Sequence, residues 1–177
     1  MRNYIHQGNL SFKDKVLSFD YLLIFLILLL GIISFFAMYS TESGNFGYYT
    51  KSHIYRFCVF FTIFFVISFF KIQFWHKSSY LFYLVVLILL FAVDFFGVTA
   101  SGSKRWINLF VFNLQPSELM KVALIIFLAR YYDKIPPHEA NRFRYMLIPI
   151  VALLIPVSLI ITQPDLGTAV LVAIGGV

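Results

Sequence analysis

The sequence predicts an all-α protein, a polytopic transmembrane helix bundle with five complete spans and the start of a sixth. The first observation is composition, because 60% of the 177 residues are hydrophobic and only 12% are charged. Soluble domains average about 45–50% apolar and about 25% charged residues. The second observation is that the apolar residues form runs close to the ~20 residues that a helix needs to cross a bilayer. Together these features exclude an ordinary soluble domain.

The predicted spans follow one another along the chain. They cover residues 20–40, 53–70, 79–98, 116–132 and 145–162, and a sixth begins near Pro164 and is still apolar at Val177. A spanning helix rarely stops about 14 residues after its start. We therefore expect this chain to be the N-terminal part of a longer protein. Residues 1–18 are polar and form a predicted cytoplasmic tail, and residues 19–177 form the N-terminal half of a transmembrane domain.

The distribution of Lys and Arg predicts that the N-terminus is cytoplasmic, since cytoplasmic loops carry an excess of these residues. With that orientation the outer segments hold three bases, which are Lys51, Lys104 and Arg105. A further base, Arg56, lies just inside the second predicted helix. The inner segments hold nine: Arg2, Lys13, Lys15, Lys71, Lys77, Arg130, Lys134, Arg142 and Arg144. The outer loops are then 41–52 and 99–115, with a tight turn at Gln163.

The formal net charge of +6 does not indicate a nucleic-acid partner, because the bases are spread between apolar runs and not clustered on one soluble face. The single cysteine, Cys58, gives neither a disulfide framework nor a metal site. The histidines have no metal-ligand spacing. No metal or other cofactor is predicted, and the sequence leaves open whether a divalent metal shares a phosphate site.

The segment "QPSELMK" opens the fourth predicted helix with unusual polarity. Pro116 suits the first helical position, Gln115 precedes it as the cap, and Glu118 faces the positive end of the helix dipole. Capping alone explains Glu118 but not Lys121. Lys121 follows by three residues, on the same helix face, and either snorkels toward headgroups or forms a polar site with Glu118. We favour the polar site, because ionisable residues in spanning helices usually mark function.

Other charged residues are expected at the same outer end. Lys104 and Arg105 form a basic pair that either anchors the loop to anionic headgroups or clamps a phosphate-bearing substrate. Asp165, in "TQPDLGT", is expected to cap the sixth helix. Asp94 is a candidate structural partner for Lys104 or Arg105. This one-sided clustering favours a site near the outer surface over a proton relay through the membrane.

Two blocks of the sequence together resemble the SEDS family of cell-wall proteins, the RodA/FtsW group. In chain order they are "GSKRWINLFVFNLQPSELMKVALIIFLARYY" and "QPDLGTAVLV". The segments "FDYLLIFLILLLGIISFFAMYS" and "FFGVTASGSKRW" are more similar to the RodA branch. The resemblance covers residues 19–177. It implies a multi-pass protein of the bacterial cytoplasmic membrane that polymerises lipid II at the outer face during cell elongation and rod-shape maintenance. It also implies a class B penicillin-binding protein as a crosslinking partner.

The resemblance implies activity-related roles for Arg105, Glu118, Lys121 and Asp165. We predict that Lys104, Trp106 and Gln115 support these residues. The resemblance places the catalytic Asp in a later outer loop, beyond Val177, so we expect this chain alone to be inactive. Arg105 and Lys121 are predicted to bind the pyrophosphate, and Glu118 and Asp165 to hold those bases or orient the substrate. The alternatives are a lipid-linked precursor transporter (a flippase) and a non-catalytic scaffold of the elongation machinery.

Overall fold

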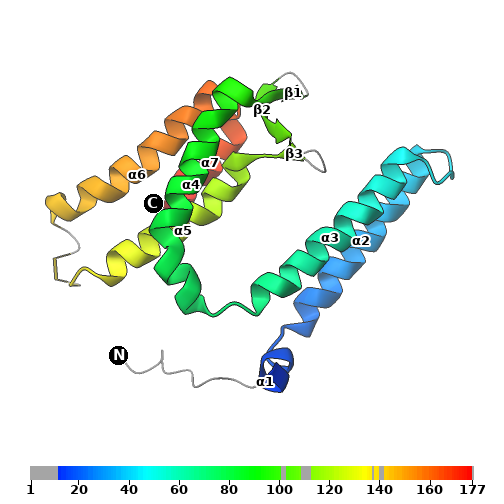
Figure 1. The fold of residues 1–177 in the computed structure, drawn as a ribbon, viewed down its shortest axis with the longest axis horizontal. Helices are drawn as coiled ribbons and strands as arrows, with labels where there is room; N and C mark the ends of the chain where they lie inside the picture. Colours follow the sequence, from blue (N-terminus) through cyan, green and yellow to red (C-terminus); the bar gives the residue numbers. More distant parts are fainter. Residues whose placement is uncertain (1–11, 101–102, 109–112, 137, 140–141, 177) are drawn as a thin grey trace. The chain divides into compact units, whose positions relative to one another are not determined.

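The computed structural model describes residues 12–100, 103–108, 113–136, 138–139 and 142–176 (Figure 1). These residues fall into two compact units, Met1–Phe70 (unit 1) and Lys71–Val177 (unit 2). Residues 19–177 were predicted as one transmembrane domain, and the boundary at Phe70 was not predicted. Each unit is described by itself.

Unit 1 contains a helical hairpin preceded by a short helix. Helix α1 is Phe12–Leu17, α2 is Tyr21–Thr41 and α3 is Tyr48–Ser68. Helix α2 begins after Asp20, whose carboxylate accepts a hydrogen bond from the Leu23 N–H at 3.1 Å and so satisfies a free donor of the first turn. Helix α3 begins five residues before the predicted start of the second span.

The early start of α3 is explained by Glu42, which follows the last turn of α2. Its carboxylate accepts hydrogen bonds from the backbone N–H groups of Tyr49 and Thr50, at 2.9 and 3.0 Å, and from the Thr50 hydroxyl. Glu42 therefore caps the neighbouring helix and closes the hairpin. Gly47 permits this approach, because a Cβ at that position would lie 2.2 Å from Glu42 Oε1. These hydrogen bonds, that of the Thr50 hydroxyl foremost, lower the pKa of the Glu42 carboxyl from its ordinary value.

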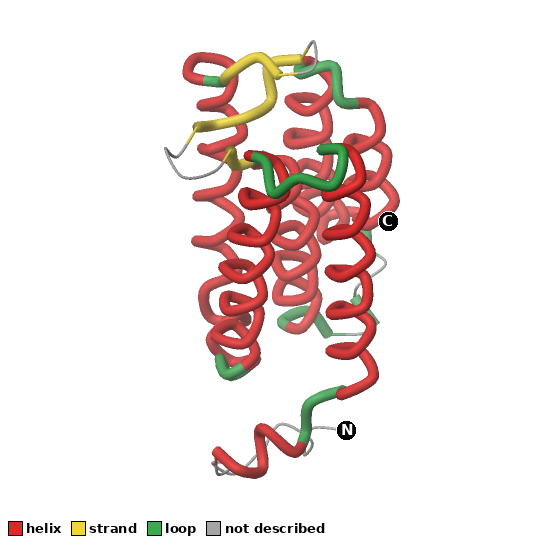
Figure 2. Tube along the Cα trace, turned by 90° about the vertical axis from the view of Figure 1, so that its right-hand side faces the viewer, coloured by secondary structure: helices red, strands yellow, loops and turns green. Residues whose placement is uncertain are grey.

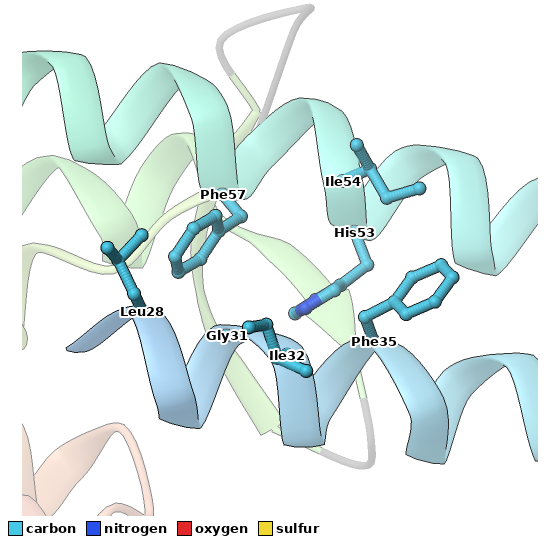
Figure 3. A pocket seen from close by; sticks show the side chains of 7 residues that line it. All are labelled: Leu28, Gly31, Ile32, Phe35, His53, Ile54 and Phe57. Atoms are coloured by element: carbon cyan, nitrogen blue, oxygen red, sulfur yellow. The ribbon is translucent and has the colours of Figure 1, made fainter. Parts of the chain in front are cut away.

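A small apolar groove of about 180 Å³ lies between α2 and α3 (Figure 3). The His53 imidazole points from α3 toward Gly31 and Ile32 of α2, and its Nε2 is buried and has no hydrogen-bond partner among the residues that the structure describes. A Cβ at Gly31 would lie 2.4 Å from the Phe57 ring, so the glycine allows this ring to pack closely against α2. The other residues of the lining are apolar, and the groove gives no convergent set of polar groups.

Unit 2 contains four helices and three short strands. The helices are α4, Ile72–Phe96; α5, Pro116–Asp133; α6, Phe143–Thr162; and α7, Leu166–Gly176. The strands are β1, Val98–Ala100; β2, Ser103–Asn108; and β3, Asn113–Leu114. They pair antiparallel in the order β1-β2-β3, at the end of the unit where α4 ends and α5 begins (Figures 1 and 2). The helix bundle was predicted correctly, and the small sheet in the 99–115 loop was not.

The core of unit 2 lies around α5. Met120 and Leu124 of α5 are fully buried and belong to one apolar cluster with residues from α4, α6 and α7. The other fully buried side chains of this cluster are Val86, Leu90, Ala123, Ile160 and Val172. The burial of α5 among its neighbours holds its first turn, with "QPSE", against the starts of β2 and α7.

Among the described residues, four helices are long and apolar enough to cross a membrane: α2, α3, α4 and α6. Helix α5 forms where a span was predicted, but it carries charged residues near both ends. Helix α7 is apolar and shorter. The predicted number of spans therefore stays a prediction, whereas a transmembrane helical bundle is confirmed.

Candidate functional site

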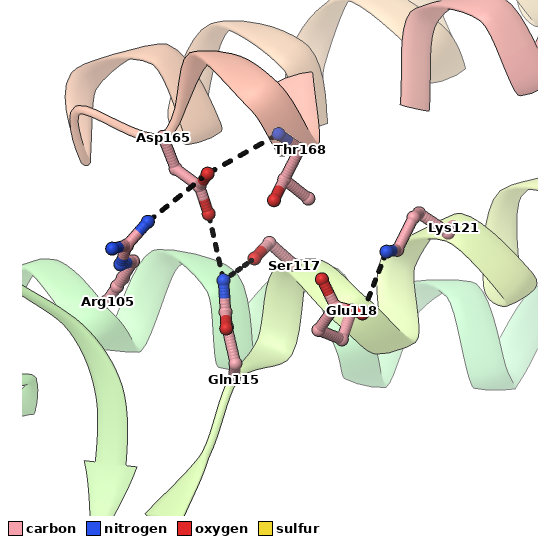
Figure 4. A network of polar contacts seen from close by, with 7 residues as sticks. All are labelled: Arg105, Gln115, Ser117, Glu118, Lys121, Asp165 and Thr168. Atoms are coloured by element: carbon pink, nitrogen blue, oxygen red, sulfur yellow. Dashed lines mark hydrogen bonds and ion pairs between the residues drawn. The ribbon is translucent and has the colours of Figure 1, made fainter. Parts of the chain in front are cut away.

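Asp165 is the centre of a polar cluster at the end of unit 2 that carries the strands (Figure 4). It precedes α7, and its Oδ1 accepts a hydrogen bond from the Thr168 N–H at 3.4 Å. This confirms the predicted cap of the last helix. The Asp165 side chain is only 9% exposed. A buried carboxylate needs partners for its remaining lone pairs, and two other elements supply them.

Arg105 supplies the first partner from β2. Its Nη1 lies 3.3 Å from Asp165 Oδ1, and the Arg105 side chain is 27% exposed. Arg105 Nε is buried and has no hydrogen-bond partner among the described residues. The same is true of the Ser103 hydroxyl, two residues earlier in the strand. The pairing of β1 with β2 is irregular here, because Val98 lies opposite Trp106 and Thr99 opposite Lys104, so Arg105 occupies a bulge. Two buried donors without a partner among the described residues therefore lie close together in sequence at this irregular part of the strand.

Gln115 supplies the second partner. Its Nε2 donates to Asp165 Oδ2 at 2.8 Å and to the Ser117 hydroxyl at 3.1 Å. Gln115 is the N-cap residue of α5 as predicted, but its side chain does not cap that helix. The amide nitrogen instead donates across the cluster to the Asp165 carboxylate. The first turns of α5 and α7 are thereby tied together.

Glu118 and Lys121 form the predicted pair on α5. Lys121 Nζ lies 2.7 Å from Glu118 Oε2, and the side chains are 28% and 53% exposed respectively. The expected contact on one helix face is confirmed. Within the described residues, no hydrogen bond or ion pair joins this pair to Asp165. The pair lies further along α5 than Gln115 and Ser117 (Figure 4). Lys121 is a cation beside the cluster and not a partner within it.

A second set of polar contacts, made by Lys104 and Gln163, links the cluster to α4. Lys104 Nζ donates to the main-chain oxygen of Asp94 at 2.7 Å. The Asp94 carboxylate accepts instead from Gln163 Nε2 at 3.2 Å, and the same amide donates to the Leu90 carbonyl at 2.9 Å. Lys104 therefore does contact Asp94, but through the main chain, and Arg105 pairs with Asp165 instead.

Gln163 was not among the predicted site residues. It is 3% exposed and stands two residues before Asp165. Its amide fixes the turn between α6 and α7 against the last turn of α4, so it helps to place the Asp165 carboxylate. The dipeptide Gln-Pro occurs at positions 115–116 and again at 163–164. This repetition was the signal in the sequence that could have identified Gln163. In both places the glutamine side chain makes a long-range contact instead of a local cap.

Trp106 was predicted to support the site. It lies in β2 opposite Val98 of β1 and is half-buried. Trp106 is the residue at which the regular pairing with β1 resumes after the bulge at Arg105. Its role is therefore in packing the two strands that carry Arg105.

The contacts of the cluster limit the chemistry of each residue. Asp165 uses both oxygens, so it is not free to act as a general base. Its carboxylate holds the Arg105 guanidinium and the Gln115 amide, whereas Lys121 is paired with Glu118 outside the cluster. In the part of the chain that the structure describes, no group of three His, Cys, Asp or Glu residues could hold a metal ion.

A family model described as "Cell cycle protein" and named for FtsW, RodA and SpoVE matches residues 17–177. The chain belongs to this family. It is 41% identical over 96 residues to the peptidoglycan glycosyltransferase MrdB of Escherichia coli K12, an alignment that covers 53% of the chain and 25% of MrdB. It is 30% identical over 165 residues to a probable peptidoglycan glycosyltransferase FtsW of Haemophilus influenzae, covering 91% of the chain and 41% of that protein.

Solved structures show the same fold. The rod shape determining protein RodA of Thermus thermophilus is similar with a TM-score of 0.74 and 25% identity, over 88% of this chain and 50% of that one. A chain of a peptidoglycan synthase complex is similar with a TM-score of 0.78 and 26% identity, over 90% of this chain and 46% of that one. This FtsW/RodA-type chain spans half or less of each of these relatives. It is a multi-pass membrane protein, and its similarity to MrdB and to RodA supports the RodA branch.

Proposed function

We propose that this protein takes part in peptidoglycan polymerisation as a glycosyltransferase of the RodA type. Its substrate would be lipid II, at the outer face of the bacterial cytoplasmic membrane. The relatives named as peptidoglycan glycosyltransferases support the reaction class. The observation that carries the proposal is the Arg105–Asp165 ion pair, which holds a partly exposed guanidinium in a fixed position at the end of unit 2 that carries the strands. Such a group suits a pyrophosphate better than a neutral sugar, because guanidinium N–H groups match phosphate oxygens.

Each residue has a distinct role in this proposal. Arg105 binds the undecaprenyl pyrophosphate that departs as the glycosidic bond forms, and Lys121 adds a positive charge that stabilises the leaving group. Asp165 and Gln115 position Arg105 through the contacts described above. Glu118 orients the Lys121 ammonium. The base that activates the attacking sugar hydroxyl is assigned to none of the described acids, since Asp165 is fully engaged.

The outer location rests on charge and on the position of the site. The bases in the segments at the other end of unit 2 outnumber those beside the Arg105–Asp165 pair, which is the pattern of a cytoplasmic end. With that orientation the N-terminus is cytoplasmic and the pair faces the outer leaflet. A partner that crosslinks the new glycan strands, a class B penicillin-binding protein, fits the similarity to a peptidoglycan synthase complex.

The test uses protein produced from the whole reading frame that encodes this chain, purified with and without its crosslinking partner, in liposomes that contain lipid II. We expect glycan chains on a gel, and a loss of at least tenfold for Arg105→Gln. Arg142→Gln removes the same charge at the opposite end of the unit and serves as the matched control. If well-folded protein moves the lipid II headgroup across the bilayer and makes no polymer, the protein is a transporter and the proposal is wrong. Full activity of the Arg105→Gln protein would contradict the assigned role of the guanidinium.

A further inference from the structure

A second cluster of cations lies at the opposite end of unit 2, where α4 begins and α5 ends. The Arg130 guanidinium carbon lies 4.3 Å from the centre of the Tyr80 ring, and Lys134 Nζ lies 5.3 Å from the same centre. Arg130 is in the last turn of α5 and Lys134 is its C-cap. Two cations are thus gathered on one aromatic side chain of α4. Each is attracted by the ring, but the ring does not cancel their charge.

No carboxylate compensates these two cations among the described residues. The nearest acid in sequence, Asp133, pairs with His76 at 3.3 Å, and Glu139 pairs with Arg142 at 3.3 Å. Residues four apart on a helix are neighbours, and like charges there repel each other. The cluster therefore holds two positive charges close together, and neither is in an ion pair within the described residues.

Arg130 also keeps an unused donor. Its Nη1 donates to the Lys77 carbonyl and lies 3.5 Å from the Ser79 hydroxyl, so the guanidinium is fixed in place. Its Nε is buried and has no hydrogen-bond partner within the described residues. The guanidinium therefore contributes a fixed positive charge, and the exposed Lys134 ammonium next to it supplies donors that suit phosphate oxygens.

The depth of the cluster indicates where the phosphate comes from. The apolar run of α4 begins at Ser79, so Tyr80 lies at the boundary of the hydrocarbon, where tyrosine rings and lipid headgroups meet. One turn further along the same face, Leu84 is 51% exposed. A lipid whose phosphate contacts Lys134 can therefore lay an acyl chain along α4. A soluble anion would gain nothing from this apolar surface.

We propose that Tyr80, Arg130 and Lys134 form a binding site for an anionic phospholipid of the inner leaflet. The lipid phosphate lies between the guanidinium and the ammonium, and an acyl chain lies along the Leu84 face. The site is at the other end of the unit from Arg105 and Asp165. It does not depend on the proposed glycosyltransferase function, except that the same orientation makes this end cytoplasmic.

The experiment is native mass spectrometry of the full protein in neutral detergent, with phosphatidylglycerol or phosphatidylcholine added at equal concentrations. We expect preferential retention of phosphatidylglycerol. Lys134→Gln should weaken that binding about fivefold, the effect of one base near a lipid headgroup. Tyr80→Phe keeps the ring and should bind as the unaltered protein does, and Tyr80→Leu should bind less. Arg142→Gln is the matched control, because it removes a base at the same end that already has a carboxylate partner.

Three outcomes would overturn the proposal. The first is equal retention of the two lipids by the unaltered protein. The second is an equal loss of phosphatidylglycerol in the Lys134→Gln and Arg142→Gln proteins, which would indicate general charge attraction. The third is displacement of the lipid by inorganic phosphate at the same concentration, which would indicate a soluble anion. Gel filtration and a thermal melt of each variant ensure that a loss of binding is not a loss of fold.

Discussion

Arg105 Nη1 and Asp165 Oδ1 lie 3.3 Å apart, and this ion pair joins β2 to the start of α7. Gln115 brings the first turn of α5 to the same carboxylate. Three segments that are distant in sequence therefore converge on Asp165, and the carboxylate acts as a positioning group. Removing its charge should release Arg105 while leaving the backbone turn in place.

Asp165→Asn is predicted to reduce activity of the whole protein at least tenfold and to lower the free energy of unfolding by about 1–3 kcal/mol, the cost of leaving a partly buried partner unsatisfied. Polymerisation of lipid II and a thermal melt measure the two effects. Asp133→Asn is the matched control, because its pair with His76 is exposed at the opposite end. Unchanged activity in a stable Asp165→Asn protein would remove Asp165 from the site.

Glu118 and Lys121 are predicted to matter for activity and little for stability. Their pair is largely exposed, and exposed ion pairs contribute about 0–1 kcal/mol. Lys121→Gln should therefore melt close to the unaltered protein while its activity falls.

A charge-swapped protein, Glu118→Lys with Lys121→Glu, separates two explanations of such a loss. It restores the ion pair but not the cation at position 121. If the swap recovers activity, the pair matters only as a pair, and the role of Lys121 at the pyrophosphate is wrong.

Tyr83→Phe is predicted to lower stability and to leave activity unchanged, the opposite of what we expect for Lys121→Gln. The Tyr83 hydroxyl donates to the Ala152 carbonyl at 2.7 Å and links α4 to α6 inside the core. Its loss should lower the free energy of unfolding by about 0.5–1.5 kcal/mol. Activity at a temperature well below the melt should not change, because the residue lies in the core and makes no contact with the Arg105–Asp165 cluster. A large loss of activity in a folded Tyr83→Phe protein would extend the site into the core.

The sequence predicts the helices because a helix that crosses a bilayer needs a long apolar run, and such runs can be seen directly in the sequence. It predicts the Glu118–Lys121 contact because spacing along one helix fixes which side chains meet. The sheet in the 99–115 loop was missed, since β2 is a short strand with two adjacent bases and no clear alternation. Short strands of this kind are set by pairing with neighbours.

The partner of Arg105 could not be predicted from the sequence, because it depends on tertiary structure. Asp94 and Asp165 were both available at the outer end, and the structure pairs Arg105 with Asp165. Gln163 was missed because a neutral amide leaves no signal in a charge pattern. Its importance lies in its burial and in two contacts with α4, which no local rule provides.

The cap that Glu42 forms between α2 and α3 is predicted to depend on pH. Hydrogen bonds from Thr50 and Tyr49 lower the pKa of its carboxyl in the folded hairpin. A carboxyl whose pKa is lowered by folding stabilises the folded state above its unfolded pKa, about 4.3. That contribution is lost as the pH falls through the lowered folded value. The cap between α2 and α3 should therefore hold at pH 7 and weaken in acid.

Hydrogen–deuterium exchange at Tyr49 and Thr50 tests this, after correction for the intrinsic effect of pH on exchange. At pH 7 we expect Glu42→Gln to exchange faster at these two amides than the unaltered protein. The difference should shrink at about pH 4 and below, where the carboxyl of the unaltered protein becomes protonated. Asp20→Asn is the matched control, because Asp20 caps α2 and not α3. If the difference at pH 7 were absent, or if it persisted unchanged in acid, the charge of Glu42 would not hold the start of α3, and the early beginning of that helix would need another cause.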